Sequence, residues 1–111
     1  MQNTRITQEL YIHHAELCKV FSHPKRLELI NVLRDRELSV GELAKRLKLS
    51  IGNLSQHLAM MKSRRVVSTR KVGNVVYYRL SNPKMLKAFD LIREILYEQI
   101  RRTSALIEEK K

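Results

Sequence analysis

Residues 39–61 read S-V-G-E-L-A-K-R-L-K-L-S-I-G-N-L-S-Q-H-L-A-M-M, and this stretch decides the fold. Ser39 and Glu42 form the pattern S-x-x-E of a capping box, which predicts that a helix begins there. Apolar residues then recur at helical spacing up to Leu47, and Ser50 is an N-cap that predicts a second helix. Two short helices joined by about three residues are typical of a helix-turn-helix, with Leu49 in the corner.

The second of these helices is followed by a change of hydrophobic period. The apolar residues that we expect this helix to bury are Ile51, Leu54, Leu58 and Met61. After it come V-V-S-T-R-K at 66–71 and V-V-Y-Y-R-L at 75–80, both rich in β-branched or aromatic residues. The turn V-G-N at 72–74 provides the positive φ that a hairpin needs. A basic hairpin directly after a helix-turn-helix predicts a wing.

Helical patterns flank this central unit on both sides. We expect a first helix at about 7–22, a second that begins at Pro24, and a last one at about 83–108, capped by Asn82. The stripe of the first helix is Leu10, His14, Leu17 and Phe21, and that of the last is Met85, Phe89, Ile92, Leu96, Ile100, Thr103 and Ile107. The predicted fold is mainly α with a small β-hairpin, a winged helix-turn-helix in the order α-α-α-α-β-β-α. It forms a single DNA-binding domain over residues 1–111, in which the first and last helices dimerise.

The charge of the chain is concentrated in its central segment. The whole chain has 22 Lys and Arg against 11 Asp and Glu, and residues 36–80 alone hold ten basic and two acidic residues. Concentrated positive charge favours a polyanionic partner, which is DNA, RNA or an anionic membrane. The N-terminus lacks the apolar segment of a signal peptide, and no stretch approaches the ~18 apolar residues of a membrane span. With Cys18 as its single cysteine, the chain is expected in the reducing cytoplasm.

Four blocks of sequence resemble the ArsR/SmtB family of winged-helix repressors. They are F-S-H-P-K-R-L-E-L-I at 21–30, E-L-S-V-G-E-L-A at 37–44, L-S-Q-H-L at 54–58, and V-V-Y-Y-R-L at 75–80. The resemblance covers roughly residues 8–100. It implies a homodimer formed by the first and last helices, which represses at an inverted repeat and is released from DNA by an effector.

Several positions depart from the best-known members of that family. Ser39 and Gly41 stand where many metal sensors have cysteines, and Asp90 is followed by Ile92 where others have a zinc-binding histidine. The single cysteine also falls short of the two that sulfur sensors use. The chain therefore resembles most the HlyU-like branch, which lacks those metal sites, and we expect no metal and no cofactor. Arg65 stands where the family usually has a glycine to end its recognition helix.

The helix that begins after Ser50 is predicted to lie in the major groove of double-stranded DNA. Its outward face carries Gly52, Gln56, Ala59 and Ser63, and Gln56 can pair with adenine through two hydrogen bonds. Arg70 and Lys71 are expected at the wing tip, where they would bind phosphate or enter the minor groove. The predicted DNA-binding residues are Ser50, Gly52, Asn53, Ser55, Gln56, His57, Lys62, Arg64, Arg65, Arg70 and Lys71. Of these, His57 lies toward the buried edge, where a structural role is favoured.

The sequence favours DNA binding over three other classes of function. No catalytic Ser-His-acid or Cys-His set has supporting context and no glycine-rich phosphate loop is present, so we expect no enzyme. A basic RNA-binding protein would show aromatic stacking platforms, but the aromatics are few; a protein-interaction winged helix is the other alternative. For Cys18 we favour a buried, inert thiol, with redox activity or metal binding together with His14 as the alternatives. The effector stays unknown.

Overall fold

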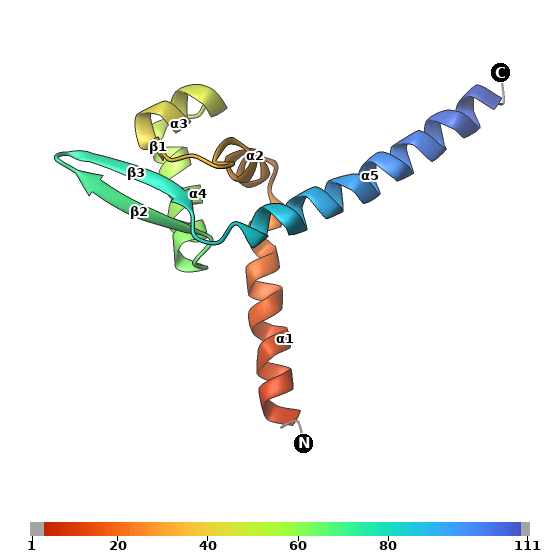
Figure 1. Cartoon of the computed structure of the whole chain (residues 1–111), viewed down its shortest axis with the longest axis horizontal. Coiled ribbons are helices and arrows are strands. Elements are labelled where there is room, and N and C mark those ends of the chain that lie inside the picture. Colours follow the sequence, from red (N-terminus) through yellow and green to blue (C-terminus); the bar gives the residue numbers. More distant parts are fainter. Residues whose placement is uncertain (1–3, 110–111) are drawn as a thin grey trace.

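The computed structural model describes residues 4–109, with side chains described up to residue 104. Its elements are α1 (Thr4–Cys18), the 3₁₀ helix η1 (Lys19–Ser22), α2 (Pro24–Val32), β1 (Leu38–Ser39), α3 (Val40–Leu47), α4 (Ile51–Ser63), β2 (Val67–Val72), β3 (Val75–Leu80) and α5 (Lys84–Glu109). Figure 1 shows a head from which α1 and α5 project as two arms in different directions. We call residues 19–89 the head, and α1 and the rest of α5 the arms. The predicted mainly α fold with a wing is confirmed.

The helix-turn-helix forms through the predicted caps. The Ser39 hydroxyl accepts a hydrogen bond from the Glu42 N–H at 3.2 Å, and the Glu42 carboxylate accepts one from the Ser39 N–H at 3.2 Å. α3 ends at Lys48, which is left-handed with φ 55°, and the Leu49 N–H donates to the Ala44 carbonyl at 3.1 Å. The Ser50 hydroxyl then accepts from the Asn53 N–H at 3.2 Å and begins α4. Both predicted helix starts are therefore confirmed.

The wing belongs to a three-stranded antiparallel sheet with the order β1-β3-β2. β3 has the bounds predicted for it, and β2 begins one residue later than expected. The third strand, β1, was not predicted; its residues Leu38 and Ser39 pair with Tyr78 and Tyr77. This pairing ties the base of the wing to the segment between α2 and α3. Gly73, with φ 60°, makes the turn between the long strands.

The core lies between α2, α3, α4, the sheet and the beginning of α5. Its buried residues are Val20, Leu29, Ile30, Leu33, Leu38, Leu43, Leu47, Leu54, Leu58, Met61, Val66, Val67, Leu86 and Phe89. Three of the four residues that α4 was expected to bury are in this set. The fourth, Ile51, was predicted wrongly, since its side chain is 59% exposed. Ile51 is the first residue of α4, and its side chain stands beyond the part of the helix that the core covers.

The arms carry most of the exposed large apolar side chains. In α1 they are Ile6, Leu10, Tyr11 and Ile12, and in α5 they are Leu91, Ile92, Ile95, Leu96, Tyr97 and Ile100. No residue of α1 is buried. The predicted stripe of the last helix thus divides: Phe89 joins the core, whereas the stripe from Ile92 onward is exposed. Ile107 lies outside the residues whose side chains are described.

Candidate nucleic-acid interface

The outer face of α4 is polar and accessible. Exposed residues on it are Gly52, Asn53, Ser55, Gln56, Ala59 and Ser63, opposite the buried Leu54, Leu58 and Met61. A Cβ added at Gly52 would meet no atom within 4 Å, so the helix surface there is open. Ser50 is used as the cap, and the Ser63 hydroxyl donates to the Met60 carbonyl at 2.7 Å. This arrangement presents a side-chain amide, a hydroxyl and a bare backbone to a partner at the beginning of the helix.

His57 faces the head rather than the outer side of α4. It is half-buried, its ring centroid lies 4.5 Å from that of His23, and its Nδ1 lies 3.4 Å from the Arg26 guanidinium. Burial, with smaller contributions from His23 and Arg26, lowers the pKa of His57. These contacts agree with a structural role, and DNA contact by His57 stays a prediction.

Arg26 links this region of α4 to the base of α1. Its guanidinium donates to the Lys19 carbonyl at 2.9 Å and to the Val20 carbonyl at 3.1 Å, while also lying beside His57. The same side chain therefore contacts the 3₁₀ helix that continues α1 and the helix whose outer face is polar. Nothing in the local sequence pattern indicated this link, because its partners are far apart in the chain.

The last turn of α4 is basic and ends without a glycine. Arg65 takes the left-handed conformation with φ 60°. Its N–H donates to the Lys62 carbonyl at 3.0 Å, and the Val66 N–H donates to the Met61 carbonyl at 2.9 Å. This is the hydrogen-bond pattern of a Schellman motif, which usually has glycine at the left-handed position. Arg65 thus keeps the local geometry that the family's glycine provides.

Three exposed basic residues, Lys62, Arg64 and Arg65, gather at this end of α4. Arg64 already has an acidic partner, since its guanidinium lies 2.5 Å from the Glu16 carboxylate of α1. Hydrogen bonding from Lys19, and then the charges of Lys19 and Arg64, lower the pKa of Glu16. The ion pair is a second link between α1 and α4.

The tip of the wing is uncharged, so the predicted position of Arg70 and Lys71 is corrected. The strands end at the pair Val72 and Val75, whereas Arg70 lies opposite Tyr77 and Lys71 opposite Val76. The predicted turn was 72–74, but β2 extends to Val72, which pairs with Val75 and adds one more residue pair between the basic residues and the turn. The two side chains therefore lie on the strand behind the tip.

Arg70 is held on the outer face of the sheet. Its guanidinium donates to the Glu37 carboxylate at 2.6 and 3.1 Å, and lies 5.3 Å from the centroid of the Tyr77 ring. The hydrogen bond raises the pKa of Arg70 and lowers that of Glu37. Since side chains alternate along a strand, Lys71 points to the opposite face, the face on which Tyr78 packs against the core. Sequence reasoning missed Glu37 because its partner is 33 residues away.

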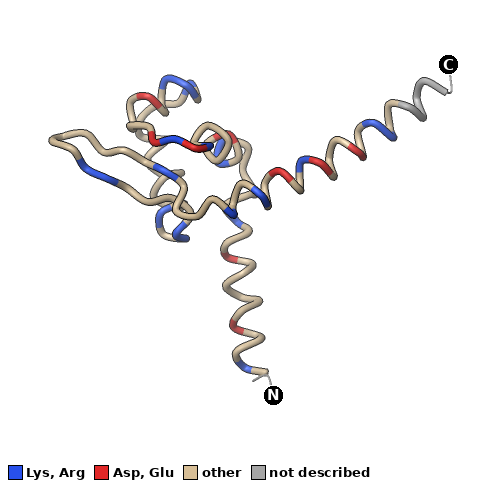
Figure 2. Tube along the Cα trace, in the orientation of Figure 1, with Lys and Arg blue, Asp and Glu red and all other residues tan. Residues whose placement is uncertain are grey.

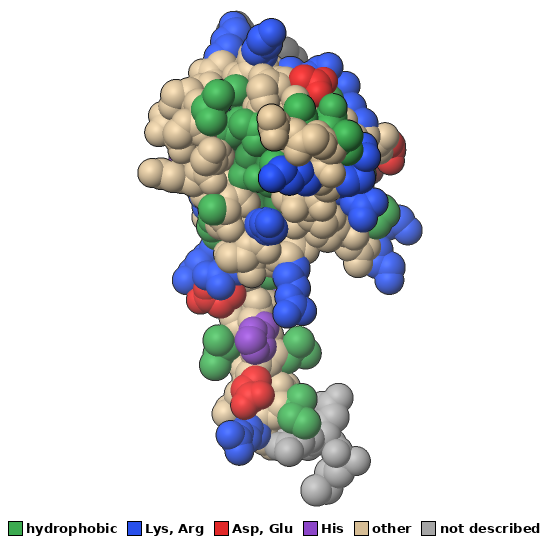
Figure 3. All heavy atoms as spheres, turned by 90° about the vertical axis from the view of Figure 1, so that its left-hand side faces the viewer, with side chains coloured by type: hydrophobic (Ala, Val, Ile, Leu, Met, Phe, Trp, Pro, Cys, Tyr) green, Lys and Arg blue, Asp and Glu red, His purple; other side chains and the backbone are tan. Residues whose placement is uncertain are grey.

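Positive charge follows the helix-turn-helix and the wing, as Figure 2 shows. In Figure 3, which looks at the molecule from the side of the wing, Lys and Arg surround a group of hydrophobic side chains on the head. Acidic residues are few on this face. The face therefore suits a polyanion that also offers apolar groups.

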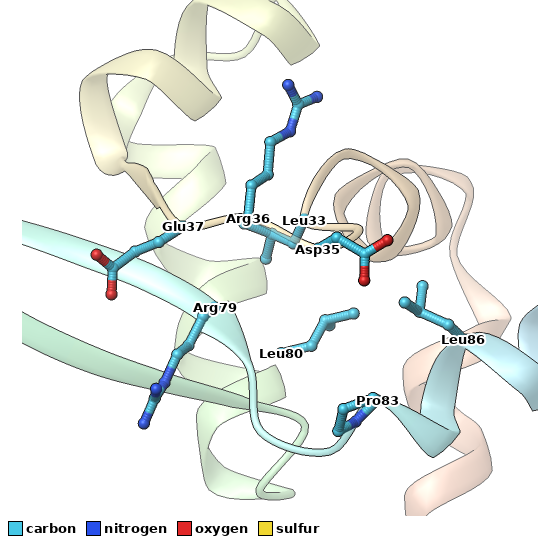
Figure 4. A pocket seen from close by; sticks show the side chains of 8 residues that line it. All are labelled: Leu33, Asp35, Arg36, Glu37, Arg79, Leu80, Pro83 and Leu86. Carbon is cyan, nitrogen blue, oxygen red and sulfur yellow. The ribbon is translucent and has the colours of Figure 1, made fainter.

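A separate hollow of about 370 Å³ lies between the end of α2, β3 and the beginning of α5. In Figure 4 its floor is apolar, while the charged groups of Arg36, Glu37 and Arg79 point away from it. Its lining contains no serine, cysteine or histidine. The hollow therefore has no nucleophile–base pair of the kind that acyl transfer uses.

The described residues show neither a metal-binding group nor a membrane-spanning helix. Among the side chains that the structure describes, those of residues 4–104, no group of three or more His, Cys, Asp and Glu is placed to hold a metal ion. Cys18 is exposed, so the expectation that it is buried was wrong. The reason is that only one side of the last turn of α1, with Glu16 and Leu17, faces the head, and Cys18 lies outside that side. None of the described helices combines the length and apolar character needed to cross a membrane.

Comparisons with known proteins agree with this geometry. The family model described as "Bacterial regulatory protein, arsR family" matches residues 23–69. The chain is 40% identical to "Transcriptional activator HlyU" of Vibrio cholerae over 71% of its own length and 73% of that protein. It is 35% identical to "Transcriptional repressor PagR" of Bacillus anthracis over 73% of its length and 82% of that protein.

A solved structure extends the likeness to the arms. The crystal structure of Rv0081 from Mycobacterium tuberculosis superposes with a TM-score of 0.77, covers 84% of this chain and 94% of that one, and is 32% identical. The fold and sequence of this chain are thus similar to those of a set of transcriptional regulators. From its helix-turn-helix, its wing and these relatives, the chain belongs to the ArsR family of DNA-binding transcriptional regulators.

Proposed function

We propose that this chain is a homodimeric, cytoplasmic repressor that binds an inverted-repeat operator in double-stranded DNA and is released by an effector. The observation that carries the proposal is the exposed polar face of α4 inside the most basic part of the chain. Among the relatives, PagR is named a repressor and HlyU an activator. We favour repression because a small dimer blocks a promoter by occupying it, whereas activation needs a further contact with another protein.

We propose that the dimer forms through the arms of the two chains. We also propose that each chain is a single domain. Leu10 in α1 and Leu96 in α5 are among the apolar residues that the arms leave exposed. A second copy of the chain is the partner that covers identical faces with a two-fold axis. Two recognition helices in such a dimer read half-sites about 34 Å apart.

Base contacts are assigned to the first turns of α4. Gln56 pairs with adenine, and Asn53 and Ser55 reach neighbouring bases or phosphates. Gly52, which lacks a side chain, allows the backbone to approach the DNA closely, and Ser50 lies beside it as the cap of the helix.

Phosphate contacts are assigned to the basic residues around α4 and on the wing, namely Lys62, Arg64, Arg65, Arg70 and Lys71. Lys71 lies on the face of β2 opposite to that of Arg70. Arg70 reaches DNA only after it breaks its ion pair with Glu37.

The test compares Gln56→Ala with Lys62→Ala on a duplex selected from a random pool. Gln56→Ala is expected to reduce discrimination between the selected and a scrambled duplex by about 1–3 kcal/mol. Lys62→Ala, the control, is expected to weaken both duplexes alike and to flatten the log–log salt slope by about one. Unchanged specific and non-specific affinity in Gln56→Ala would refute this assignment of the recognition helix.

RNA binding is distinguished by measuring duplex DNA and duplex RNA at matched salt. Preference for the selected DNA is expected, and equal or tighter RNA binding would contradict the proposal. The effector is approached by footprinting the DNA upstream of the chain's own gene, repeated with metal ions, oxidants and sulfide donors. Loss of the footprint with one of these would identify the class of effector.

A further inference from the structure

The exposed apolar side chain of Ile51 in α4 has no role in the hydrogen bonds that we assign to the polar face of this helix. It is the first residue of the helix, it is 59% exposed, and it lies next to the open surface at Gly52. We propose that Ile51 contacts the C5-methyl group of a thymine in the major groove, so that α4 reads a methyl group in addition to hydrogen-bonding groups. This inference rests on the proposed function, and it names one base feature that the protein selects.

The core does not require an isoleucine at this position. Leu54 and Leu58 of the same helix are completely or almost completely buried, whereas more than half of the Ile51 side chain faces water. All residues of α4 are described, and Ile51 is the one large apolar side chain among those that are exposed. Isolated exposed apolar residues are common on proteins, and Ile51 differs from them by its position in the first turn of α4.

Its position is the one from which recognition helices contact bases. In helix-turn-helix proteins the N-terminal residues of the recognition helix meet the base edges. The first turn of α4 is fixed by the hydrogen bond from the Asn53 N–H to the Ser50 hydroxyl at 3.2 Å, and by the burial of Leu54. Ile51 is also four residues before Ser55, so the two lie on the same side of the helix.

The chemistry of the side chain fits a methyl group rather than a polar base edge. The thymine methyl is the main apolar group that the major groove displays, and cytosine and uracil lack it. The β-branch of isoleucine restricts χ1, so that little side-chain freedom is lost when the contact forms. The space over Gly52 lets the backbone come close enough for the Ile51 side chain to reach the base.

The experiment is a double-mutant cycle in which one change is made in the protein and the other in the DNA. Each thymine of the selected duplex is replaced in turn by deoxyuridine, and affinities are measured for the parent and for Ile51→Ala. At one thymine in each half-site, a single replacement by uracil is expected to reduce the affinity of the parent protein for the duplex about fourfold. Ile51→Ala removes the contact in both half-sites of the proposed dimer, so it is expected to bind the unmodified duplex about 15-fold more weakly. Uracil at that position is expected to cause no further loss of affinity in this variant.

Two variants control for indirect effects. Val72→Ala removes another β-branched, exposed side chain, this one from the wing. In this variant, replacing the same thymine by uracil is expected to reduce affinity as much as it does in the parent. Ile51→Val keeps the branch and removes one methyl group, so it is expected to lose only part of the affinity. Thermal unfolding of Ile51→Ala is expected to match the parent, since the side chain is exposed and alanine favours helix.

The outcomes separate this inference from the proposed function. Equal uracil effects in the parent and Ile51→Ala at every thymine, or parental affinity of Ile51→Ala, would overturn the methyl contact and leave operator binding intact. A parent that does not distinguish the selected from the scrambled duplex would overturn the proposed function itself.

Discussion

The head and the arms have similar apolar patterns in sequence, but the head buries its apolar side chains and the arms leave theirs exposed. In the head, residues such as Leu29, Leu43 and Leu54 are completely buried within one chain. In the arms, Leu10 and Tyr11 are 65% and 70% exposed, and the apolar face of α5 beyond Phe89 is open. Full burial of such a side chain stabilises a folded protein by about 1.5–3 kcal/mol. In a single chain, the exposed apolar side chains of the arms do not contribute this stabilisation. The head buries its apolar residues within one copy, whereas the apolar residues of the arms are covered only in the proposed dimer.

The largest expected effect comes from breaking that partnership. Leu96→Glu combined with Ile100→Glu places two charges on the exposed face of α5. We expect sedimentation to show a monomer, and operator affinity to fall by about 10²–10⁴-fold because two half-sites are no longer linked. Arg101→Glu, a charge change on the other side of the helix, is the control and should leave the dimer intact. A dimer that survives the double substitution would place the interface elsewhere.

The second-largest effect is expected from a substitution in the core of the head, which lowers the stability of the protein. Leu58 is 1% exposed, and Leu58→Ala is expected to lower the free energy of unfolding by about 2–5 kcal/mol, through lost burial and the cavity left behind. Denaturant unfolding in the monomeric background measures this without a contribution from dimerisation. Leu10→Ala in the same background is the matched control and should leave unfolding nearly unchanged. Equal losses from both variants would remove the distinction between head and arms.

A smaller effect is expected where the head holds a residue in an unfavourable conformation. Arg65 has φ 60°, a region that disfavours a side chain by roughly 1–2 kcal/mol, while glycine loses some of this advantage to unfolded-state entropy. Arg65→Gly is therefore expected to raise the free energy of unfolding by about 0.5–1 kcal/mol. Arg65→Ala, which removes the charge but keeps a Cβ, should show no such gain. If alanine stabilises as much as glycine, charge repulsion and not backbone conformation is the cause.

The smallest effect is expected in an arm, at Cys18. Its thiol is exposed, and no described group of ligands surrounds it. We expect Cys18→Ser to bind the operator as the parent does, with no response of either protein to stoichiometric zinc or mild peroxide, as gel-shift titration would measure. Loss of DNA affinity in the parent alone upon adding either agent would make Cys18 the sensor.

Local signals in the sequence predicted the elements of the head well. The capping pair Ser39 and Glu42, the cap Ser50 and the strand at 75–80 are all present, because each depends on residues close in the chain. The two-residue strand β1 was missed, since two residues show no alternation from which to detect it. Ile51 was assigned to the core because periodicity locates a face of a helix but not the point along its axis where the core ends.

The contacts of the candidate site were predicted less well. The ion pairs of Arg70 with Glu37 and of Arg64 with Glu16 join residues far apart in sequence, and no local pattern encodes them. The apolar stripes of the first and last helices were detected, but periodicity cannot tell burial in the head from burial between chains. The structure separates these cases by leaving Ile92 exposed and Phe89 covered.

The open apolar faces of α1 and α5 have a consequence for how the controlled genes respond to the amount of this protein. In the proposed dimer, these faces are covered only when two chains meet, so the dimer population depends on protein concentration by mass action. Below the dissociation constant of the dimer, its concentration rises with the square of the total chain concentration. Operator occupancy then changes more steeply than in proportion to expression, and a twofold fall in synthesis relieves repression more than twofold.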